Sequence, residues 1–327
     1  MRRRDAIAML GGALVASPVL CGSSRALAQK RPRITILHSG FPNRTPIEHL
    51  FAALGDLGYE NARTATIDLL GGEGDSDRLN ALVAEIAAQK PDVVIALTSP
   101  AVLALKRAGY ASPVVFEFVS DPVGLGIVES LARPGGWFTG VAYSETSLGG
   151  KRLELLADAL PGLRRVAVLW SPSFAENASI LASIRTSATA LRIDIYSREL
   201  GGIEDLESAF EDAARAGAQA VIFMTDNAMF GRRKEIAELA ATHHLPSIHS
   251  FPQEVEDGGL ISFGPDIDES YRRAAGLADS ILKGAHPADL PVEEPTRFTL
   301  AINMRTAKRL GVTLPASIHV RADEVIE

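Results

Sequence analysis

Small polar and aromatic residues recur at the ends of the β-strands that the sequence predicts. Hydroxyl groups there can form directional hydrogen bonds, aromatic rings can stack on a ligand, and the helices that follow expose unpaired N–H groups. This combination is typical of a pocket for a small organic molecule. The candidate ligand-binding residues are Ser39, Phe41, Thr98, Ser99, Ser120, Asp121, Tyr143, Trp170, Thr225, Asp226, Asn227 and Phe251.

Each candidate also has an ordinary structural interpretation. Ser99, Ser120, Asp121 and Asn227 are of residue types that commonly cap helix N-termini. The aromatic candidates can equally lie in the hydrophobic core. The sequence leaves both alternatives open for each residue.

The segment FEFVSDPVGLGIVESLARPGG, residues 116–136, has the order of a nucleotide-binding loop. An apolar strand runs into a glycine-rich turn, and the sequence predicts a helix after the turn. Glu145 lies at about the spacing of a ribose-binding acid. However, Glu129 replaces the third glycine of the G-x-G-x-x-G fingerprint, and the match follows about the fourth strand instead of the first. We therefore expect no dinucleotide cofactor.

Catalytic and metal-binding patterns are weak in this chain. The sequence has no G-x-S-x-G nucleophile elbow. Only His243, His244 and His249 lie near one another, and the adjacent pair would point apart at a helix end. Carboxylate pairs are common, but none can be placed face to face from sequence. We expect no enzymatic activity, no metal site and no cofactor.

The elements that would position the candidate residues alternate between strands and helices. Short β-branched apolar runs are typical of buried parallel strands. They occur at Ile34–His38, Val93–Leu97, Val114–Phe118, Val166–Trp170 and Val221–Met224. Amphipathic helical segments such as DLESAFEDAARAG lie between them. This alternation predicts an open α/β sheet with helices on both faces.

Two stretches of the chain, residues 90–118 and 217–251, share one order of strand, polar turn, helix and Pro-led strand. Two similar halves would place these turns at equivalent strand ends, where ligands bind in open α/β sheets. The alternative is that the two stretches share only the general strand–helix pattern of α/β proteins and do not come from an internal duplication.

The composition fits a globular protein of about two domains. The chain has 327 residues, is 46% hydrophobic and carries a formal net charge of −7. The negative charge argues against nucleic-acid binding.

The N-terminus has the pattern of a cleaved signal peptide over residues 1–28. The pattern consists of basic residues at 2–4, an apolar run over residues 6–20 and a small-x-small cleavage site at 26–28. The arginines also fit a twin-arginine export route. Cleavage would remove Cys21, the only cysteine, so the mature chain would have no disulfide.

Several long segments resemble one protein family. They include SDPVGLGIVESLARPGGWFTGV, GKRLELLADALPGLRRVAVLW, GGLISFGPDIDESYRRAAGLADSILKGAHPADLPVEEPTRFTLAINMRTAKRLGVTLP and the closing RADEVIE. From Arg33 to Glu327 the chain resembles the ABC-transporter substrate-binding proteins, of the type that includes tryptophan/tyrosine-binding lipoproteins.

The resemblance implies a type I periplasmic binding protein fold, in which two Rossmann-like α/β lobes with parallel sheets are joined by a three-crossover hinge. It places the first lobe at residues 31–142 plus 253–295 and the second at 143–252 plus 297–327. The Gly124/Gly126 turn would then be a strand–helix corner that lines the cleft. Asp121 would either contact the ligand or cap the helix.

The resemblance also implies a function. The protein would be a periplasmic monomer that closes on an amino acid or an aromatic or other organic acid. It would deliver this ligand to an ABC permease, whose ATPase drives uptake. The ligand ammonium would lie at Asp226 or Asp121. Two alternatives stay open: a ligand-sensing module for a signalling receptor, and an exported α/β enzyme, which would need a nucleophile–base pair that the sequence does not show.

Overall fold

The computed structural model describes residues 31–42, 47–143, 145–172, 176–224 and 227–327. The predicted signal peptide and the candidates Thr225 and Asp226 lie outside the described residues. All five predicted strands are present, and the predicted helix is α6 (Leu206–Arg215), with Leu206 and Phe210 buried and Gly217 at φ 72° just past its end.

The strands are short and the helices connect them in alternation, as the apolar runs predicted. The strands are β1 (Arg33–His38), β2 (Thr66–Gly71), β3 (Val93–Leu97), β4 (Val114–Val119), β5 (Phe138–Ala142), β6 (Arg165–Trp170), β7 (Asp194–Glu199), β8 (Ala220–Phe223), β9 (Ser247–His249), β10 (Ile261–Pro265), β11 (Phe298–Asn303) and β12 (Glu324–Ile326). The other α-helices are α1 (Ile47–Asp56), α2 (Ser76–Gln89), α3 (Ser99–Arg107), α4 (Glu145–Ala159), α5 (Glu176–Leu191), α7 (Asn227–Phe230), α8 (Arg233–Thr242), α9 (Pro252–Glu256), α10 (Ile267–Leu282), α11 (Met304–Leu310) and α12 (Ala316–Arg321).

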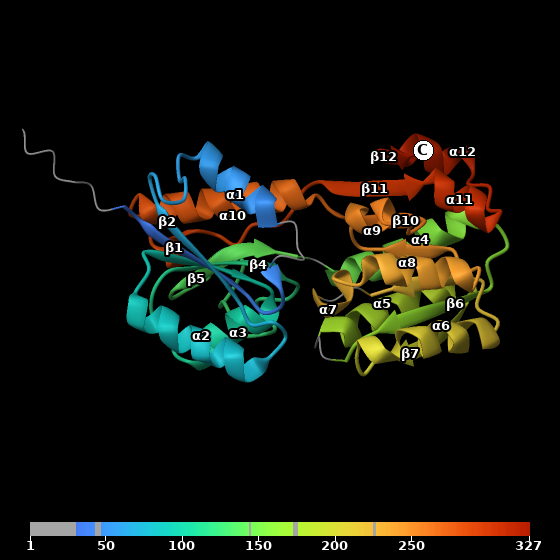
Figure 1. Cartoon of the computed structure of the whole chain (residues 1–327), viewed down its shortest axis with the longest axis horizontal. Coiled ribbons are helices and arrows are strands. Elements are labelled where there is room, and N and C mark those ends of the chain that lie inside the picture. The colour runs from blue at the N-terminus through green and yellow to red at the C-terminus, as the bar shows by residue number, and fades with distance from the viewer. Residues whose placement is uncertain (1–30, 43–46, 144, 173–175, 225–226) are drawn as a thin grey trace, which may run out of the picture. The chain divides into compact units, whose positions relative to one another are not determined.

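The first lobe is built on a parallel five-stranded sheet in the order β2-β1-β3-β4-β5. Helices α1 and α10 cover one face, and α2 and α3 cover the other (Figure 1). Successive side chains of a strand point to opposite faces, so the largely apolar strands β1, β3 and β4 bury residues against both helix layers.

The second lobe is built on a seven-stranded sheet in the order β12-β11-β10-β9-β8-β6-β7. All its pairings are parallel except that of β10 with β11. Helices α4 and α5 pack on one face, and α6 and α8 pack on the other. The molecule is therefore an α/β protein with two sheets and helices on both faces of each, as predicted.

The chain passes between the two sheets three times: after β5, after β10 and before β11. After β10 it returns to the first sheet as α10, which packs against α1 and β4. The antiparallel pairing with β11 places β10 in the seven-stranded sheet, whereas the expected bounds give residues 253–295 to the first lobe. No periodicity in the sequence signals that pairing. The lobe bounds themselves remain a prediction.

The glycine-rich segment after β4 does not form a helix. Residues 121–131 are turns and bends, in which the Asp121 Oδ1 atom accepts a hydrogen bond from the Gly124 amide at 2.8 Å. The prediction of a strand–helix corner here was wrong, because the apolar residues Ile127 and Val128 are buried by a folded-back loop instead of a helix face. No helix in the described part of the chain is long and apolar enough to span a membrane.

Candidate functional site

The candidate residues of the first lobe gather at one edge of its sheet. Strands β1, β3, β4 and β5 are parallel neighbours, so the residues that follow them, Ser39, Thr98, Ser120 and Tyr143, lie at the same carboxyl-terminal edge. The Ser39 Oγ and Thr98 Oγ1 atoms are 2.8 Å apart and share a buried hydrogen bond. The sequence did not predict this contact, because the strand order that brings the two turns together is set by tertiary structure.

Thr98 has an unusual backbone conformation, with φ 87° and ψ 148°. A β-branched residue at positive φ is strained and persists only where its surroundings hold it. Its amide donates to the Glu117 carbonyl at 2.8 Å. It occupies the N-cap position of α3, but its side chain makes no capping hydrogen bond. The hydroxyl faces Ser39 instead, so the capping interpretation does not describe Thr98.

Phe118 interrupts strand β4 with φ 56°, and the register with β5 shifts between Phe116 and Val119. The close approach of the two strands here requires Gly140, because a Cβ atom at that position would lie 2.1 Å from the Phe116 carbonyl oxygen. The β-bulge turns the Phe118 ring toward the α10 face, where it is only partly buried. Bulges of this kind commonly re-aim a side chain at a functional edge.

The Phe118 ring lies at the centre of a group of aromatic side chains. Its centroid is 5.7 Å from that of Tyr271, 5.9 Å from that of Tyr143 and 6.2 Å from that of Phe251, all in edge-to-face geometry. Phe251 also stacks on Tyr143 at 6.2 Å and meets Phe230 at 5.5 Å. We call these five residues the aromatic cluster. They come from the ends of β4, β5 and β9 and from α7 and α10. Phe118 and Phe251 are partly exposed, whereas the other three rings are buried.

A buried polar row positions Phe251. The Glu254 Oε2 atom accepts hydrogen bonds from the amides of Ser250 and Phe251 at 3.1 and 3.0 Å. The Glu254 Oε1 atom is 3.4 Å from His249 Nδ1, and His249 Nε2 is 2.9 Å from Ser247 Oγ. The side chains of Ser247, His249 and Glu254 are thus arranged in sequence like those of a hydrolase triad, but each residue is at most 2% exposed. No substrate can reach this serine, so the row is structural.

His38 is a second buried histidine, at the end of β1. Its Nδ1 atom accepts a hydrogen bond from the Gly40 amide at 2.8 Å. Burial lowers the pKa of His38 to about 4. The neutral ring therefore holds the turn that carries Ser39.

The remaining predicted residues lie in different environments. Trp170 is 8% exposed within the core of the second lobe, and its Nε1 atom donates to Ser197 Oγ at 3.0 Å. Asp121 is exposed and engaged with Gly124, while Ser99 is buried as the first residue of α3. Phe41 and Ser120 are partly exposed, and Asn227 begins α7.

Four residues at this edge were not predicted from sequence: Glu117, Phe118, Phe230 and Tyr271. Glu117 and Phe118 lie inside an apolar run that predicted a buried strand, and nothing in that run signals a bulge. An acid within an otherwise apolar strand is the one signal that could have singled out Glu117. Tyr271 and Phe230 reach the edge only through tertiary packing.

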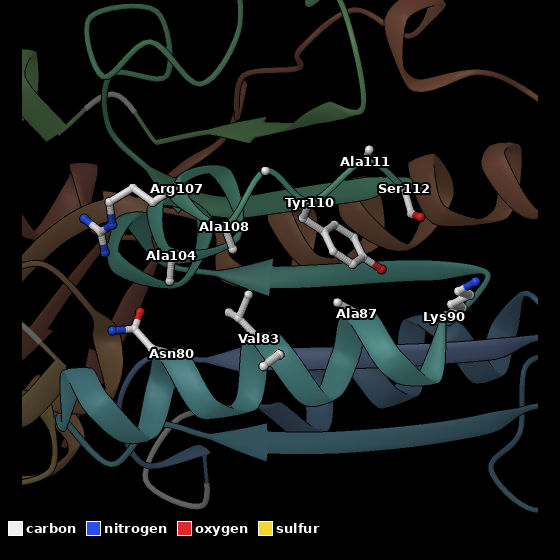
Figure 2. Close-up of a pocket in the computed structure, with 12 residues that line it drawn as sticks. Asn80, Val83, Ala87, Lys90, Ala104, Arg107, Ala108, Tyr110, Ala111 and Ser112 are labelled. Carbon is white, nitrogen blue, oxygen red and sulfur yellow. The ribbon is translucent and has the colours of Figure 1, made fainter.

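A separate groove of about 890 Å³ lies between α2 and α3. Figure 2 shows alanine side chains such as Ala87 and Ala104 in its walls, together with Val83 and Tyr110, and Lys90 and Arg107 at opposite ends. The two cations do not converge on one point, and we therefore place the ligand site at the strand ends. Among the described residues, no group of three His, Cys, Asp or Glu side chains could hold a metal ion.

A family model for the ABC transporter substrate binding protein matches residues 44–326. The chain belongs to this family. This membership confirms the class of function that the resemblance implied, that of an ABC transporter substrate-binding protein.

Relatives and solved structures agree with this assignment. The tyrosine-binding protein of Clostridioides difficile strain R20291 is 25% identical over 261 residues, which cover 80% of this chain and 74% of that protein. A conserved domain protein of Vibrio cholerae and the ABC domain of Streptococcus pneumonia in complex with L-Trp are each 24% identical, with TM-scores of 0.84 and 0.83. Both comparisons cover 90% of this chain and 100% of the other. The fold is the type I periplasmic binding protein fold.

Proposed function

We propose that this protein captures an aromatic amino acid or a related small organic acid at the strand-end edge and delivers it to an ABC permease. The observation that carries this proposal is the aromatic cluster, which includes Phe118 and Tyr143 from the same sheet edge that carries the Ser39–Thr98 hydroxyl pair. Rings supply stacking area for an aromatic side chain, and hydroxyls supply directional hydrogen bonds to a carboxylate. The relatives named for tyrosine binding and for an L-Trp complex support the same ligand class.

The cluster also supports a closing mechanism. Phe118 lies near the end of β4 and Tyr143 follows β5, both in the first sheet, whereas Phe230 and Phe251 belong to segments of the second lobe. A ligand that contacts rings from both lobes favours their closed arrangement through those contacts. The closed protein would then dock on the permease in the periplasm, after removal of residues 1–28.

A thermal-shift screen followed by titration calorimetry tests this proposal. Because a ligand that binds only the folded state stabilises it, L-Trp, L-Tyr or an aromatic acid should raise Tm, whereas sugars should not. The protein is first unfolded, dialysed and refolded to remove any copurified ligand. A sugar that raises Tm while every aromatic compound leaves it unchanged would contradict the proposed ligand class.

A further inference from the structure

Two of the three crossover segments leave the second sheet side by side. They continue the antiparallel pairing of β10 with β11, in which Pro265 faces Phe298. The Asp266 amide donates a hydrogen bond to the Arg297 carbonyl at 3.0 Å, and the Arg297 Nε atom is 3.8 Å from Asp266 Oδ2. The residues just after β10 and just before β11 therefore form a two-stranded ribbon at the junction of the lobes.

Glu269, in the first turn of α10, binds this ribbon. Its Oε2 atom accepts a hydrogen bond from the Arg297 amide at 2.9 Å, and its Oε1 atom accepts one from the Thr296 hydroxyl at 2.8 Å. Helix α10 packs on β3, β4 and β5 of the first sheet, whereas Arg297 directly precedes β11 of the second. One side chain thus fixes a first-lobe helix to the backbone that enters the second lobe.

Arg273, one helical turn further along α10, extends the network. Its guanidinium donates hydrogen bonds to Glu269 Oε1 at 2.7 Å and to Glu293 Oε2 at 2.8 Å. The Glu293 backbone pairs with β5, because its amide donates to the Gly140 carbonyl at 2.9 Å and its carbonyl accepts from the Ala142 amide at 2.8 Å. The network therefore reaches the strand from which the first crossover leaves. We call Glu269, Arg273, Glu293 and Thr296 the hinge clamp.

The charged groups of the hinge clamp are partly shielded from solvent. Isolated exposed ion pairs contribute little to stability, but networks of several charges with good geometry are the exception. The Glu269 side chain is 13% exposed and that of Arg273 is 29% exposed. Burial acts to raise the pKa of Glu269, but hydrogen bonds from Arg273, Thr296 and the Arg297 amide outweigh it and lower this pKa to about 2. The carboxylate is therefore ionised from mildly acidic to alkaline pH.

We propose that the hinge clamp turns the ribbon and α10 into one rigid pivot, about which the two lobes close on a ligand. The inference rests on the closing mechanism of the proposed function. None of the four residues belongs to the aromatic cluster or to the Ser39–Thr98 pair, so the clamp acts on the ligand only by restricting how the lobes are oriented. A ligand that closes loosely connected lobes must also immobilise them, and this entropy cost weakens binding.

Distance measurements between two spin labels, by electron–electron double resonance, test the pivot. Cys21→Ser removes the only native cysteine. The labels are attached through Asn80→Cys on α2 of the first lobe and Glu207→Cys on α6 of the second, and both positions are exposed. The protein is refolded to remove any copurified ligand. The width of the distance distribution then reports the range of lobe orientations in the empty protein.

Two substitutions break the hinge clamp, Glu269→Ala and Arg273→Ala. Glu269→Gln removes the charge and keeps the length of the side chain, and it replaces Glu269→Ala if that variant fails to fold. Glu238→Ala is the matched control. Glu238 forms an ion pair with Arg309 at 2.6 and 2.8 Å between α8 and α11, so its removal deletes a charged pair within the second lobe.

We expect Glu269→Ala and Arg273→Ala to broaden the distance distribution of the empty protein, whereas Glu238→Ala leaves it unchanged. The double variant should broaden it no further than the wider single variant, because both substitutions break the same network. Calorimetry should show the affinity for L-Trp lowered by about 5-fold or more in the clamp variants, the lower end of the coupling between distant sites. The effect should be equal at about pH 5.5 and about pH 8, since Glu269 is ionised at both.

A distribution as narrow in Glu269→Ala and Arg273→Ala as in the wild type would overturn the pivot, and so would equal broadening in Glu238→Ala. Loss of L-Trp affinity without broadening would assign the effect to the ligand site itself, so the pivot would fall while the proposed function stands. If the wild type binds no L-Trp, the proposed aromatic amino acid loses its support, and the distributions of the empty protein still decide on the pivot.

Discussion

The Ser39 and Thr98 hydroxyl oxygens lie 2.8 Å apart, although 59 residues separate them in the chain. The contact exists because β1 and β3 are parallel neighbours and end at the same level of the sheet. Both hydroxyls are buried at the edge where ligands bind in open α/β sheets. The strand order of the first sheet therefore brings these two hydroxyls together at the proposed ligand site.

We predict that removing one hydroxyl of the Ser39–Thr98 pair reduces the affinity for the ligand. Ser39→Ala should weaken binding of the aromatic ligand by about 10-fold and lower the free energy of unfolding by about 1 kcal/mol, because it deletes one buried hydrogen bond and leaves Thr98 without its partner. Titration calorimetry and urea unfolding measure the two effects. Ser130→Ala, which removes a hydroxyl that closes a turn with Arg133, should leave ligand affinity unchanged. Equal affinity in both variants would contradict a ligand role for the pair.

The aromatic cluster predicts that Phe251 contributes to binding. Phe251→Ala should weaken binding of an aromatic ligand by about 2- to 13-fold through the loss of ring stacking alone, which is worth about 0.5–1.5 kcal/mol beyond simple burial. Phe298→Ala is the matched control, because this ring stacks on Phe263 at 5.9 Å and is 40% exposed. Calorimetry on both variants separates a ligand contact from a general effect of losing a ring. Undiminished affinity in Phe251→Ala would remove the cluster from the site.

We predict that substitution of Gly264 in β10 strongly lowers the free energy of unfolding. A Cβ atom there would lie 2.1 Å from the Ser250 carbonyl oxygen, so Gly264→Ala forces the backbone beside Phe251 to move. We expect a loss of more than about 2 kcal/mol, the scale of overpacking in a close-packed interior. Gly276→Ala, inside α10 with no atom within 4 Å of its Cβ position, should instead stabilise by about 0.5–1 kcal/mol. Chemical unfolding of both variants checks the contrast, and similar stabilities would contradict the close approach of β10 to Ser250.

The buried His38 ring predicts a dependence of stability on pH. Burial holds its pKa at about 4 in the folded protein, below the ordinary value of 6.5, so the unfolded chain binds a proton that the folded chain excludes. The contribution is fully present above pH 6.5 and is lost as pH falls from 6.5 toward 4, by about 3 kcal/mol in total.

Urea unfolding between pH 4 and pH 8 measures this slope. His38→Asn should flatten it, whereas His244→Asn, at an exposed residue with φ 53° that asparagine tolerates, should leave it intact. A slope in His38→Asn as steep as in the wild type would assign the acid sensitivity to other groups.

The sequence predicted the strands well because a fully buried parallel strand needs a largely apolar run, and β3 and β6 have an unbroken one. It also placed candidate residues at the carboxyl ends of strands, where ligands bind in open α/β sheets, but it did not predict the contact between the Ser39 and Thr98 hydroxyls, because that contact depends on the strand order. It did not predict the loop at residues 121–131, because a glycine-rich turn followed by apolar residues suits a helix as well as a folded-back loop. Phe118 was missed because a bulge at positive φ depends on the neighbouring strand and on Gly140.

A crystal structure of the refolded protein with an aromatic ligand from the screen tests the central claim most directly. The account predicts ligand density at the strand-end edge, with an oxygen within hydrogen-bond distance of Ser39 or Thr98 and an aromatic ring against Phe118, Tyr143 or Phe251. Density confined to the groove between α2 and α3, lined by Ala87 and Arg107, with the strand-end edge unchanged, would contradict it.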